Sequence, residues 1–323
     1  MALPPPLHNI LFTIPRTASN LVTQLLNLPA QPSISRHPRD GYFFLPALSY
    51  RYKHDTFSRA IASWTVQEQT GMRNALQTSL DAWKAWIDQA EREGKGTFIK
   101  EHVNWMIATD AESHYLHEGR KDGEESTIAH NPTCVPDVFL LNNVRATFLV
   151  RHPALTFPSL LRSALDNEGV DQVLEESTEN AMRWEATYHW HVAVYKFLTS
   201  SPRASNTHRP LILDASDLSN PDLVRKYAVA VGLDPELVRF EWDAVSSEEQ
   251  ERMGSVEARM KDTLLKSRGV VLGKLQSGDE VDVGRERENW SAEFGEVLGE
   301  RLVRFVDGAM GDYEWLWDRR LRV

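Results

Sequence analysis

The sequence predicts an α/β protein built on a doubly wound parallel sheet flanked by helices. Short apolar segments of strand length alternate with longer segments of helical periodicity along most of the 323 residues. This alternation is typical of parallel strands joined by right-handed helical crossovers. Polar residues also follow directly after several predicted strands, which is where ligands bind in sheets of this kind. Together these observations predict a binding site at the carboxyl ends of the strands.

The first predicted strand, residues 10–14, is short, apolar and rich in β-branched residues. Leucines then recur at helical spacing through residues 21–28. Between them lies the polar turn 15–20, which carries hydroxyl groups and one cation. A helix that starts at such a turn directs its first N–H groups and its dipole toward the turn, which favours an anion. We therefore expect a phosphate or phosphosulfate here; an ordinary turn with a Ser or Asn cap is the alternative.

The next part of the chain contains a long connection, a helical region and a second strand. Residues 56–92 have the periodicity of one or two amphipathic helices, and glycines follow them. Residues 97–100 predict a buried strand that leads directly into His102. The segment 111–136 is polar and contains Gly and Pro, so we expect a flexible surface insertion there.

The clearest buried strand of the sequence is residues 146–150, which run directly into Arg151. The charged, glycine-containing segment 243–290 predicts a loop-rich region. The other expected elements are helices at 157–165, 178–199, 222–231 and 292–309 and a strand at 211–213.

Composition and charge exclude several classes of protein. The formal net charge of −10 argues against a general nucleic-acid-binding protein, although a few local cations can still hold a small anionic ligand. The single cysteine, Cys134, excludes an intrachain disulfide and a cysteine metal cluster, which fits a reducing compartment. The sequence has no signal-like segment and no run of about eighteen apolar residues, so we expect a cytoplasmic protein that does not enter a membrane.

The turn 15–20 resembles the 5′-phosphosulfate loop of the sulfotransferases that use 3′-phosphoadenosine 5′-phosphosulfate. In that family the loop reads Pro-Lys/Arg-Ser/Thr-Gly-Thr/Ser-Thr, and here it reads PRTASN. Ala18 stands where glycine is usual and Asn20 where a hydroxyl is usual; alanine fits without strain if its φ is negative. The resemblance implies that the donor is bound by Arg16, Thr17, Ala18, Ser19 and Asn20.

Further motifs of this family follow in the expected order. Arg151 and Ser159 match its 3′-phosphate motif, although Ala154 and Leu155 replace a Lys/Arg-Asp pair that is common there. Arg268 and Gly269 resemble the C-terminal element that closes over the same phosphate. The resemblance implies a P-loop NTPase-like fold and a single sulfotransferase domain that spans residues 1–323.

A third motif, Lys-x-His, is matched by Lys100 and His102. The resemblance implies that His102 is the general base and that Lys100 and Arg16 assist at the sulfonyl group. A histidine with an unperturbed pKa of about 6.5 suits proton abstraction near neutral pH. The mechanism needs no metal. Aromatic residues in the segments 42–52 and at Trp105 favour a small apolar or aromatic acceptor that carries a hydroxyl group.

Two other functions remain open at this stage. A repurposed protein with the same fold but without donor use is consistent with Ala18 and Asn20. A nucleotide-dependent phosphotransferase is the other alternative, but the segment 269–275 has the wrong glycine spacing for a Walker A loop and a leucine after its lysine. Trp184 or Trp190 could stack on adenine, although tryptophans at helical spacing usually belong to a core. Three histidines in the expected insertion are a weaker candidate for zinc: His114, His117 and His130.

Overall fold

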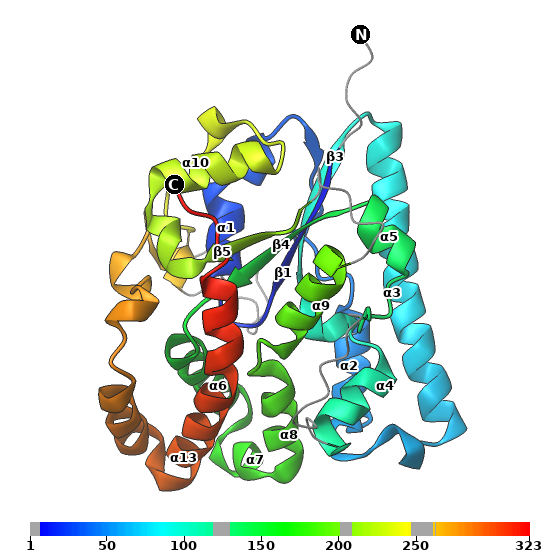
Figure 1. The fold of residues 1–323 in the computed structure, drawn as a ribbon, viewed down its shortest axis with the longest axis vertical. Helices are drawn as coiled ribbons and strands as arrows, with labels where there is room; N and C mark the ends of the chain where they lie inside the picture. Colours follow the sequence, from blue (N-terminus) through cyan, green and yellow to red (C-terminus); the bar gives the residue numbers. More distant parts are fainter. Residues whose placement is uncertain (1–6, 119–129, 201–208, 247–260, 262) are drawn as a thin grey trace. The chain divides into compact units, whose positions relative to one another are not determined.

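The computed structural model describes residues 7–118, 130–200, 209–246, 261 and 263–323. Five strands form one sheet in the order β2-β3-β1-β4-β5 (Figure 1). Because this order runs outward from β1 in both directions, the sheet is doubly wound, and the predicted α/β class with a parallel sheet is confirmed. The strands are β1 (His8–Thr13), β2 (Ile34–Ser35), β3 (Gly96–His102), β4 (Arg145–Val150) and β5 (Leu211–Asp214).

The central strands are buried along their whole length, as expected for a sheet that is covered on both faces. β1 pairs in parallel with β3, and the register matches Thr13 with His102 at the carboxyl ends of the two strands. On its other side β1 pairs with β4, where the stacked rings of Phe12 and Phe148 lie 5.1 Å apart. The last residues of β1 and β3 are therefore level with each other.

The described residues divide into two compact units. The first unit is formed by residues in the ranges 1–14, 33–148 and 175–211, and the second by residues in the ranges 15–32, 149–174 and 212–323. Each unit is assembled from separate stretches of chain, and the chain passes from one unit to the other directly after β1. The expectation of a single domain over residues 1–323 stays a prediction.

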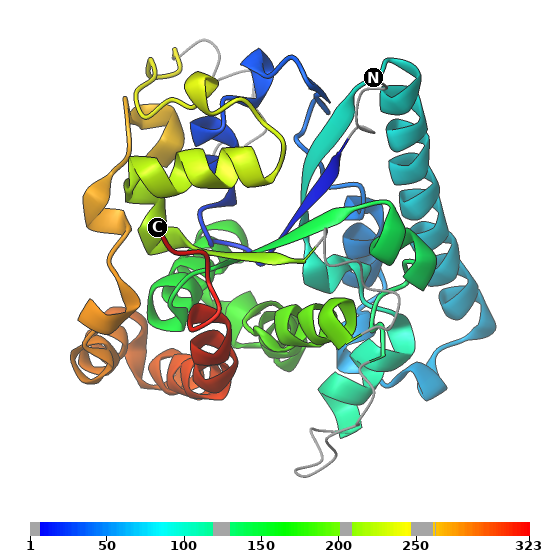
Figure 2. The ribbon, with the colours of Figure 1, turned by 45° about the horizontal axis from the view of Figure 1, so that its top comes forward.

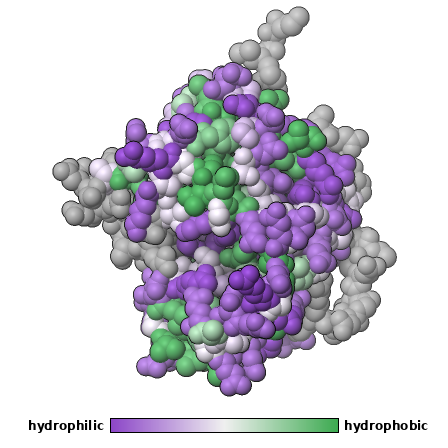
Figure 3. All heavy atoms as spheres, turned by 90° about the vertical axis from the view of Figure 1, so that its left-hand side faces the viewer, coloured by the Kyte–Doolittle hydropathy of each residue, from purple (hydrophilic) through white to green (hydrophobic). Residues whose placement is uncertain are grey.

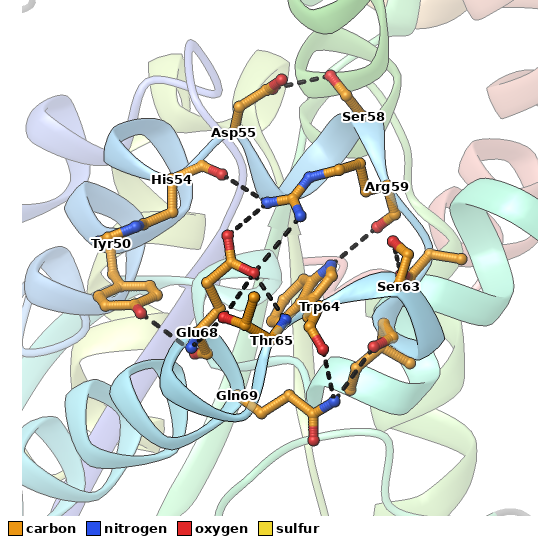
Figure 4. A network of polar contacts seen from close by, with 12 residues as sticks. Tyr50, His54, Asp55, Ser58, Arg59, Ser63, Trp64, Thr65, Glu68 and Gln69 are labelled. Atoms are coloured by element: carbon orange, nitrogen blue, oxygen red, sulfur yellow. Dashed lines mark hydrogen bonds and ion pairs between the residues drawn. The ribbon is translucent and has the colours of Figure 1, made fainter.

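In the first unit, α3 runs alongside β3 and packs against α2 (Figures 1 and 2). The periodic apolar residues of α3 are buried, as the sequence predicted, and include Trp83 and Ile87. The helix begins at Val66 instead of residue 56 because a capping box between Thr65 and Glu68 fixes its start (Figure 4). The helices of this unit are α2 (Leu45–Lys53), α3 (Val66–Arg92), α4 (Thr109–Ser113), α5 (Asp137–Asn142), α8 (Glu176–Glu185) and α9 (His189–Ser200).

Two expectations about the first unit need correction. The helix predicted at 178–199 is two helices, α8 and α9, separated by a break at residues 186–188; Ala186 has φ of −87° and ψ of 59°, which ends α8. Of the expected insertion 111–136, residues 119–129 lie outside the described ranges. The described part begins in α4 and a short π-helical turn, and a bridge between Ile107 and Thr133 fixes its far end.

In the second unit, α1 (blue) and α10 (yellow-green) lie side by side in Figures 1 and 2. Their contact is apolar, with Val22 and Leu25 of α1 beside Leu223 and Tyr227 of α10. In the described residues the helices of this unit include α1 (Ser19–Leu25), α6 (Pro153–Glu168), α7 (Val170–Leu174), α10 (Pro221–Ala230) and α13 (Val283–Trp317).

The last helix is longer than the sequence suggested. It begins at Val283 rather than at residue 292, because the Asp282 side chain accepts a hydrogen bond from Arg285 N and caps the helix, and Gly295 with φ of 81° interrupts it. Part of the predicted loop-rich segment 243–290 is therefore helical. Residues 247–260 and 262 of that segment lie outside the described ranges.

The surface drawn in Figure 3 is mostly hydrophilic, with hydrophobic residues in smaller groups. Exposed apolar side chains of the described residues include Val66, Val229 and Leu272. None of the helices in the described ranges is both long enough and apolar enough to cross a membrane.

Candidate functional site

The second unit brings three of the predicted donor-binding residues into direct contact. Arg16 Nε donates a hydrogen bond to Ser159 Oγ at 3.0 Å, although 143 positions separate the two residues. Arg151 Nη1 donates to the carbonyl oxygen of Arg16, also at 3.0 Å. Two guanidinium groups are thereby held at the turn that follows β1. Guanidinium groups bind phosphate and sulfate oxygens through parallel hydrogen bonds, so this cluster suits an anion with several oxygens.

The backbone of the turn corrects one expectation. Ala18 has φ of +66°, and Arg16 also lies in the left-handed region with φ of 69°. The negative φ that would let alanine fit without strain is therefore absent, and a left-handed alanine costs about 1–2 kcal/mol. Ala18 occupies the N-cap of α1 without a side-chain cap, which excludes the ordinary Ser or Asn cap. Thr17 and Ser19 are buried, and Asn20 is half-buried.

Replacing Ala18 with glycine is expected to stabilise the protein by about 0.5–1 kcal/mol, because the relief of left-handed strain exceeds the added entropy of the unfolded chain. Denaturant unfolding of the purified variant measures this difference. The exposed helical residue Ala85 supplies the control, since Ala85→Gly should destabilise the protein by about 1 kcal/mol. An Ala18→Gly variant that is destabilised to the same degree would contradict the strain.

The C-terminal segment reaches the same cluster through a residue that the sequence did not single out as a ligand. Arg151 Nη2 donates to the carbonyl oxygen of Lys274 at 3.0 Å. The predicted residue Arg268 is exposed, and its carbonyl oxygen accepts a hydrogen bond from Trp242 N. Gly269 forms an isolated bridge with Glu241. Arg268 and Gly269 thus lie in the same unit as Arg151, and the hydrogen bond that ties this segment to Arg151 comes from Lys274.

The first unit contains a buried cluster at the end of β3. Lys100, Glu101 and His102 are each at most 6% exposed. The Lys100 ammonium group lies 5.0 Å from the centroid of the Tyr42 ring. The His102 ring contacts two aromatic rings, with centroid distances of 5.2 Å to Tyr42 and 4.5 Å to Trp105. The predicted base and its neighbouring lysine therefore lie in one aromatic enclosure.

Thr13 lies against His102, a contact that sequence patterns do not indicate. The Thr13 hydroxyl donates to the carbonyl oxygen of Glu101 at 3.2 Å and lies 2.7 Å from His102 Nδ1. A Thr13 hydroxyl that donates to Glu101 O accepts from Nδ1–H of His102, and in that tautomer Nε2 carries the lone pair. This leaves Nε2 as the ring atom that accepts a proton.

The pKa of His102 departs from the unperturbed value that the sequence suggested. Burial and, after it, the charges of Lys100 and His191 lower the pKa to about 3, against a hydrogen bond with Thr13 that raises it. His102 is therefore neutral across the physiological range. The expectation of a pKa near 6.5 was wrong because the sequence does not report that the ring is enclosed next to a cation.

The pKa of Glu101 is shifted in the opposite direction to that of His102. Burial raises its pKa to about 8, although hydrogen bonds from the backbone N–H groups of Phe43, Phe44 and Tyr42 and the charge of Lys100 act in the opposite direction. Its Oε1 accepts a hydrogen bond from Phe43 N. A carboxyl group with this pKa is mostly protonated at pH 7.

A pocket of about 360 Å³ lies in the first unit, lined by the segment 37–49 with Tyr42 and Phe43 among its residues.

The two tryptophans considered for adenine stacking belong to the core of this unit. Trp184 is fully buried beside Phe57, and Trp190 is 2% exposed and packs against Tyr115. In the described ranges no three His, Cys, Asp or Glu side chains are grouped so that they could hold a metal ion.

Comparison with known proteins gives two extensive similarities. Sulfotransferase ppzF of Metarhizium rileyi (strain RCEF 4871) is 34% identical over 333 residues, which covers 97% of this chain and 96% of that protein. Sulfotransferase ppzF of Metarhizium majus (strain ARSEF 297) is 32% identical over 338 residues, which covers 98% of each. No family model matches the chain.

Two solved structures are also similar over most of their length. The sulfotransferase domain from the Synechococcus PCC 7002 olefin synthase has 10% sequence identity and a TM-score of 0.41, covering 95% of this chain and 96% of that domain. The sulfotransferase from Alicyclobacillus acidocaldarius has 13% identity and a TM-score of 0.35, covering 85% of this chain and 100% of that one.

Proposed function

Because this chain belongs to the sulfotransferases and is an enzyme of that class, we propose that its donor is 3′-phosphoadenosine 5′-phosphosulfate and its acceptor a small apolar or aromatic molecule with a hydroxyl group. The observation that carries the donor assignment is the hydrogen-bonded set of Arg16, Ser159 and Arg151. These residues come from two motifs that are far apart in the sequence, and each motif corresponds to one phosphate of this donor.

In the proposed mechanism, His102 Nε2 takes the proton of the acceptor hydroxyl while the acceptor oxygen attacks sulfur. The bond between sulfur and the bridging phosphate oxygen breaks, and the nucleotide leaves with that electron pair. Arg16 and Lys100 neutralise charge on the sulfonyl and leaving oxygens.

The low pKa of His102 in the ligand-free protein bears on this role. Lys100 is one of the groups that lower the pKa of His102, and an anionic sulfonyl group beside Lys100 would offset that charge. Binding of the donor would thus raise the proton affinity of the base at the moment when it is needed. The acceptor assignment is supported by the pocket at 37–49 and by the rings of Tyr42 and Trp105 around His102.

The donor assignment predicts a preference between two nucleotides. Calorimetric titration should show tight binding of 3′-phosphoadenosine 5′-phosphate and weak binding of ADP, which lacks the 3′-phosphate. Arg151→Ala should weaken the first affinity about 30- to 100-fold, because hydrogen bonds to a charged group are lost. Arg162 of α6, the helix that follows Arg151, forms a half-exposed ion pair with Glu293, and Arg162→Ala should leave the affinity unchanged.

Each outcome of this titration decides between the candidate functions. Equal affinity for the two nucleotides would contradict recognition of a 3′-phosphate. Failure to bind either nucleotide would favour the alternative function, a protein of the same fold that does not use the donor. The strained backbone at Ala18 is consistent with that alternative.

A further inference from the structure

The segment Asp40–Phe44 adopts a strained backbone against the end of β3. Three successive residues have positive φ, namely Asp40 at 55°, Gly41 at 129° and Tyr42 at 62°. A left-handed conformation is unfavourable for residues other than glycine, so Asp40 and Tyr42 require compensating interactions. Gly41 is also needed for space, since a Cβ atom there would lie 2.1 Å from the carbonyl oxygen of Lys100.

The compensating interactions come from two consecutive residues of β3. Lys100 holds the segment through its backbone, with Lys100 N donating to Asp40 O at 2.8 Å and Tyr42 N donating to Lys100 O at 3.1 Å. Glu101 holds it through its side chain, since Oε1 accepts a hydrogen bond from Phe43 N and the backbone N–H groups of Tyr42 and Phe44 also stabilise the ionised carboxyl group. Successive backbone N–H groups in such a turn form a nest, a concavity that favours an anion.

This anchoring determines where the Tyr42 ring lies. The ring covers the Lys100 ammonium group at 5.0 Å and lies 5.2 Å from the His102 ring and 5.4 Å from that of Trp105. The same segment lines the pocket at 37–49. The position of Tyr42, and with it one wall of the enclosure around His102, therefore depends on the contact between Glu101 and the backbone.

We propose that Glu101 is a positioning residue for sulfuryl transfer, which anchors the segment Asp40–Phe44 and so places Tyr42 over Lys100 and beside His102. The proposal rests on the proposed function in one respect, the roles of Lys100 and His102. Glu101 itself touches neither donor nor acceptor. Its side chain is fully buried, and it acts through the backbone that it holds.

The test compares Glu101→Leu, which cannot accept hydrogen bonds, with Glu101→Gln, which keeps an acceptor oxygen in the same place. Amide hydrogen exchange of the peptide that covers Tyr42–Phe44 should accelerate about tenfold or more in the leucine variant, because the N–H groups lose their acceptor. The glutamine variant should remain within about threefold of the unaltered protein.

Kinetics on the same variants give the functional readout. With 3′-phosphoadenosine 5′-phosphosulfate as donor and 2-naphthol as acceptor, Glu101→Leu should raise the acceptor KM or lower kcat about tenfold. Its affinity for 3′-phosphoadenosine 5′-phosphate, measured by calorimetry, should stay within about twofold. Glu101→Gln should restore the kinetic constants.

Glu68 is a matched control because its carboxylate also accepts a hydrogen bond from a backbone N–H, that of Thr65, at the start of α3 (Figure 4). Glu68→Leu should lower stability without changing acceptor kinetics. Unchanged amide exchange in Glu101→Leu would overturn the anchoring. Faster exchange with unchanged acceptor kinetics would make Glu101 merely structural and would also overturn the proposal.

Two further results separate this proposal from the proposed function. Equal losses in the leucine and glutamine variants would show that the accepting oxygen is not what matters, and would overturn the positioning role while sulfuryl transfer by the unaltered protein stands. If the unaltered protein binds no nucleotide and transfers no sulfuryl group, the proposed function fails, and the kinetic part of the proposal fails with it.

Discussion

His102→Ala is expected to lower the rate of sulfuryl transfer about 10³-fold while the affinity for 3′-phosphoadenosine 5′-phosphate changes little. Loss of a general base typically costs between about 10² and 10⁴ in rate. Nucleotide affinity should be retained because the candidate donor ligands Arg16, Ser159 and Arg151 belong to the other unit. Single-turnover transfer from the donor to 2-naphthol and calorimetry on the same preparation measure the two quantities.

The pH profile gives an independent check on the same residue. Since burial next to Lys100 lowers the pKa of His102 to about 3, the ring stays neutral above pH 5. The rate of the unaltered enzyme should therefore show no loss that is centred near pH 6.5. Thr13→Val removes the acceptor of the Nδ1 proton and frees the ring to take the other tautomer, so it should lower kcat with little effect on donor affinity.

Survival of turnover in His102→Ala would make the histidine structural, and the base would have to be sought elsewhere in the enclosure. A loss of both turnover and nucleotide affinity would indicate a general disturbance of the fold. Only a loss of turnover alone supports the assignment of His102 as base.

Glu112→Ala is expected to destabilise the protein by about 3–5 kcal/mol, because it leaves the charge of Arg51 buried without its partner. Arg51 is fully buried, and its Nε donates to Glu112 Oε2 at 2.8 Å. The guanidinium group also donates to the carbonyl oxygens of Trp105 and Ile107. Denaturant unfolding at neutral pH measures the loss in free energy of unfolding.

Two further variants separate this loss from the net contribution of the ion pair. The double variant Arg51→Met with Glu112→Leu leaves no charge of this ion pair buried. It should therefore be more stable than Glu112→Ala. The half-exposed pair of Arg287 and Asp307 is the matched control, and Asp307→Ala should cost less than about 1 kcal/mol. Equal effects at the buried and the exposed pair would contradict the argument.

The Arg51 contacts also link stability to the enclosure around His102. Arg51 holds the carbonyl oxygen of Trp105, whose ring lies against His102. Variants of the ion pair that remain folded should therefore be compared with the unaltered enzyme at temperatures well below their unfolding transitions.

Local patterns predicted the strands at the centre of the sheet because buried parallel strands are continuous apolar segments. They missed β2, which has only two residues, Ile34 and Ser35, and whose pairing depends on β3 rather than on its own composition. They also merged α8 with α9. The break at residues 186–188 does not interrupt the spacing of apolar residues, so periodicity alone does not detect it.

Sequence patterns located those residues of the candidate site that lie at or after the ends of strands. Arg16, Lys100 and Arg151 were found because each follows or ends a strand. Their roles as ligands and catalytic groups stay predictions. Glu101 and Thr13 were missed because their importance comes from strand register and from a backbone with positive φ, which are tertiary properties. The sequence likewise does not indicate that φ is positive at Ala18.

The interleaving of the two units along the chain has a consequence for how the protein folds. The paired residues Thr13 of β1 and His102 of β3 are 89 positions apart in the sequence. The first unit therefore cannot form until a large loop has closed. A nascent chain that ends at residue 148 contains β1, β3 and most of β4 but lacks α8 and α9, which complete that unit. Parallel strands that pair at such separations form slowly, and their hydrophobic edges stay exposed meanwhile. We therefore expect the first unit to be completed only after α9 has been synthesised.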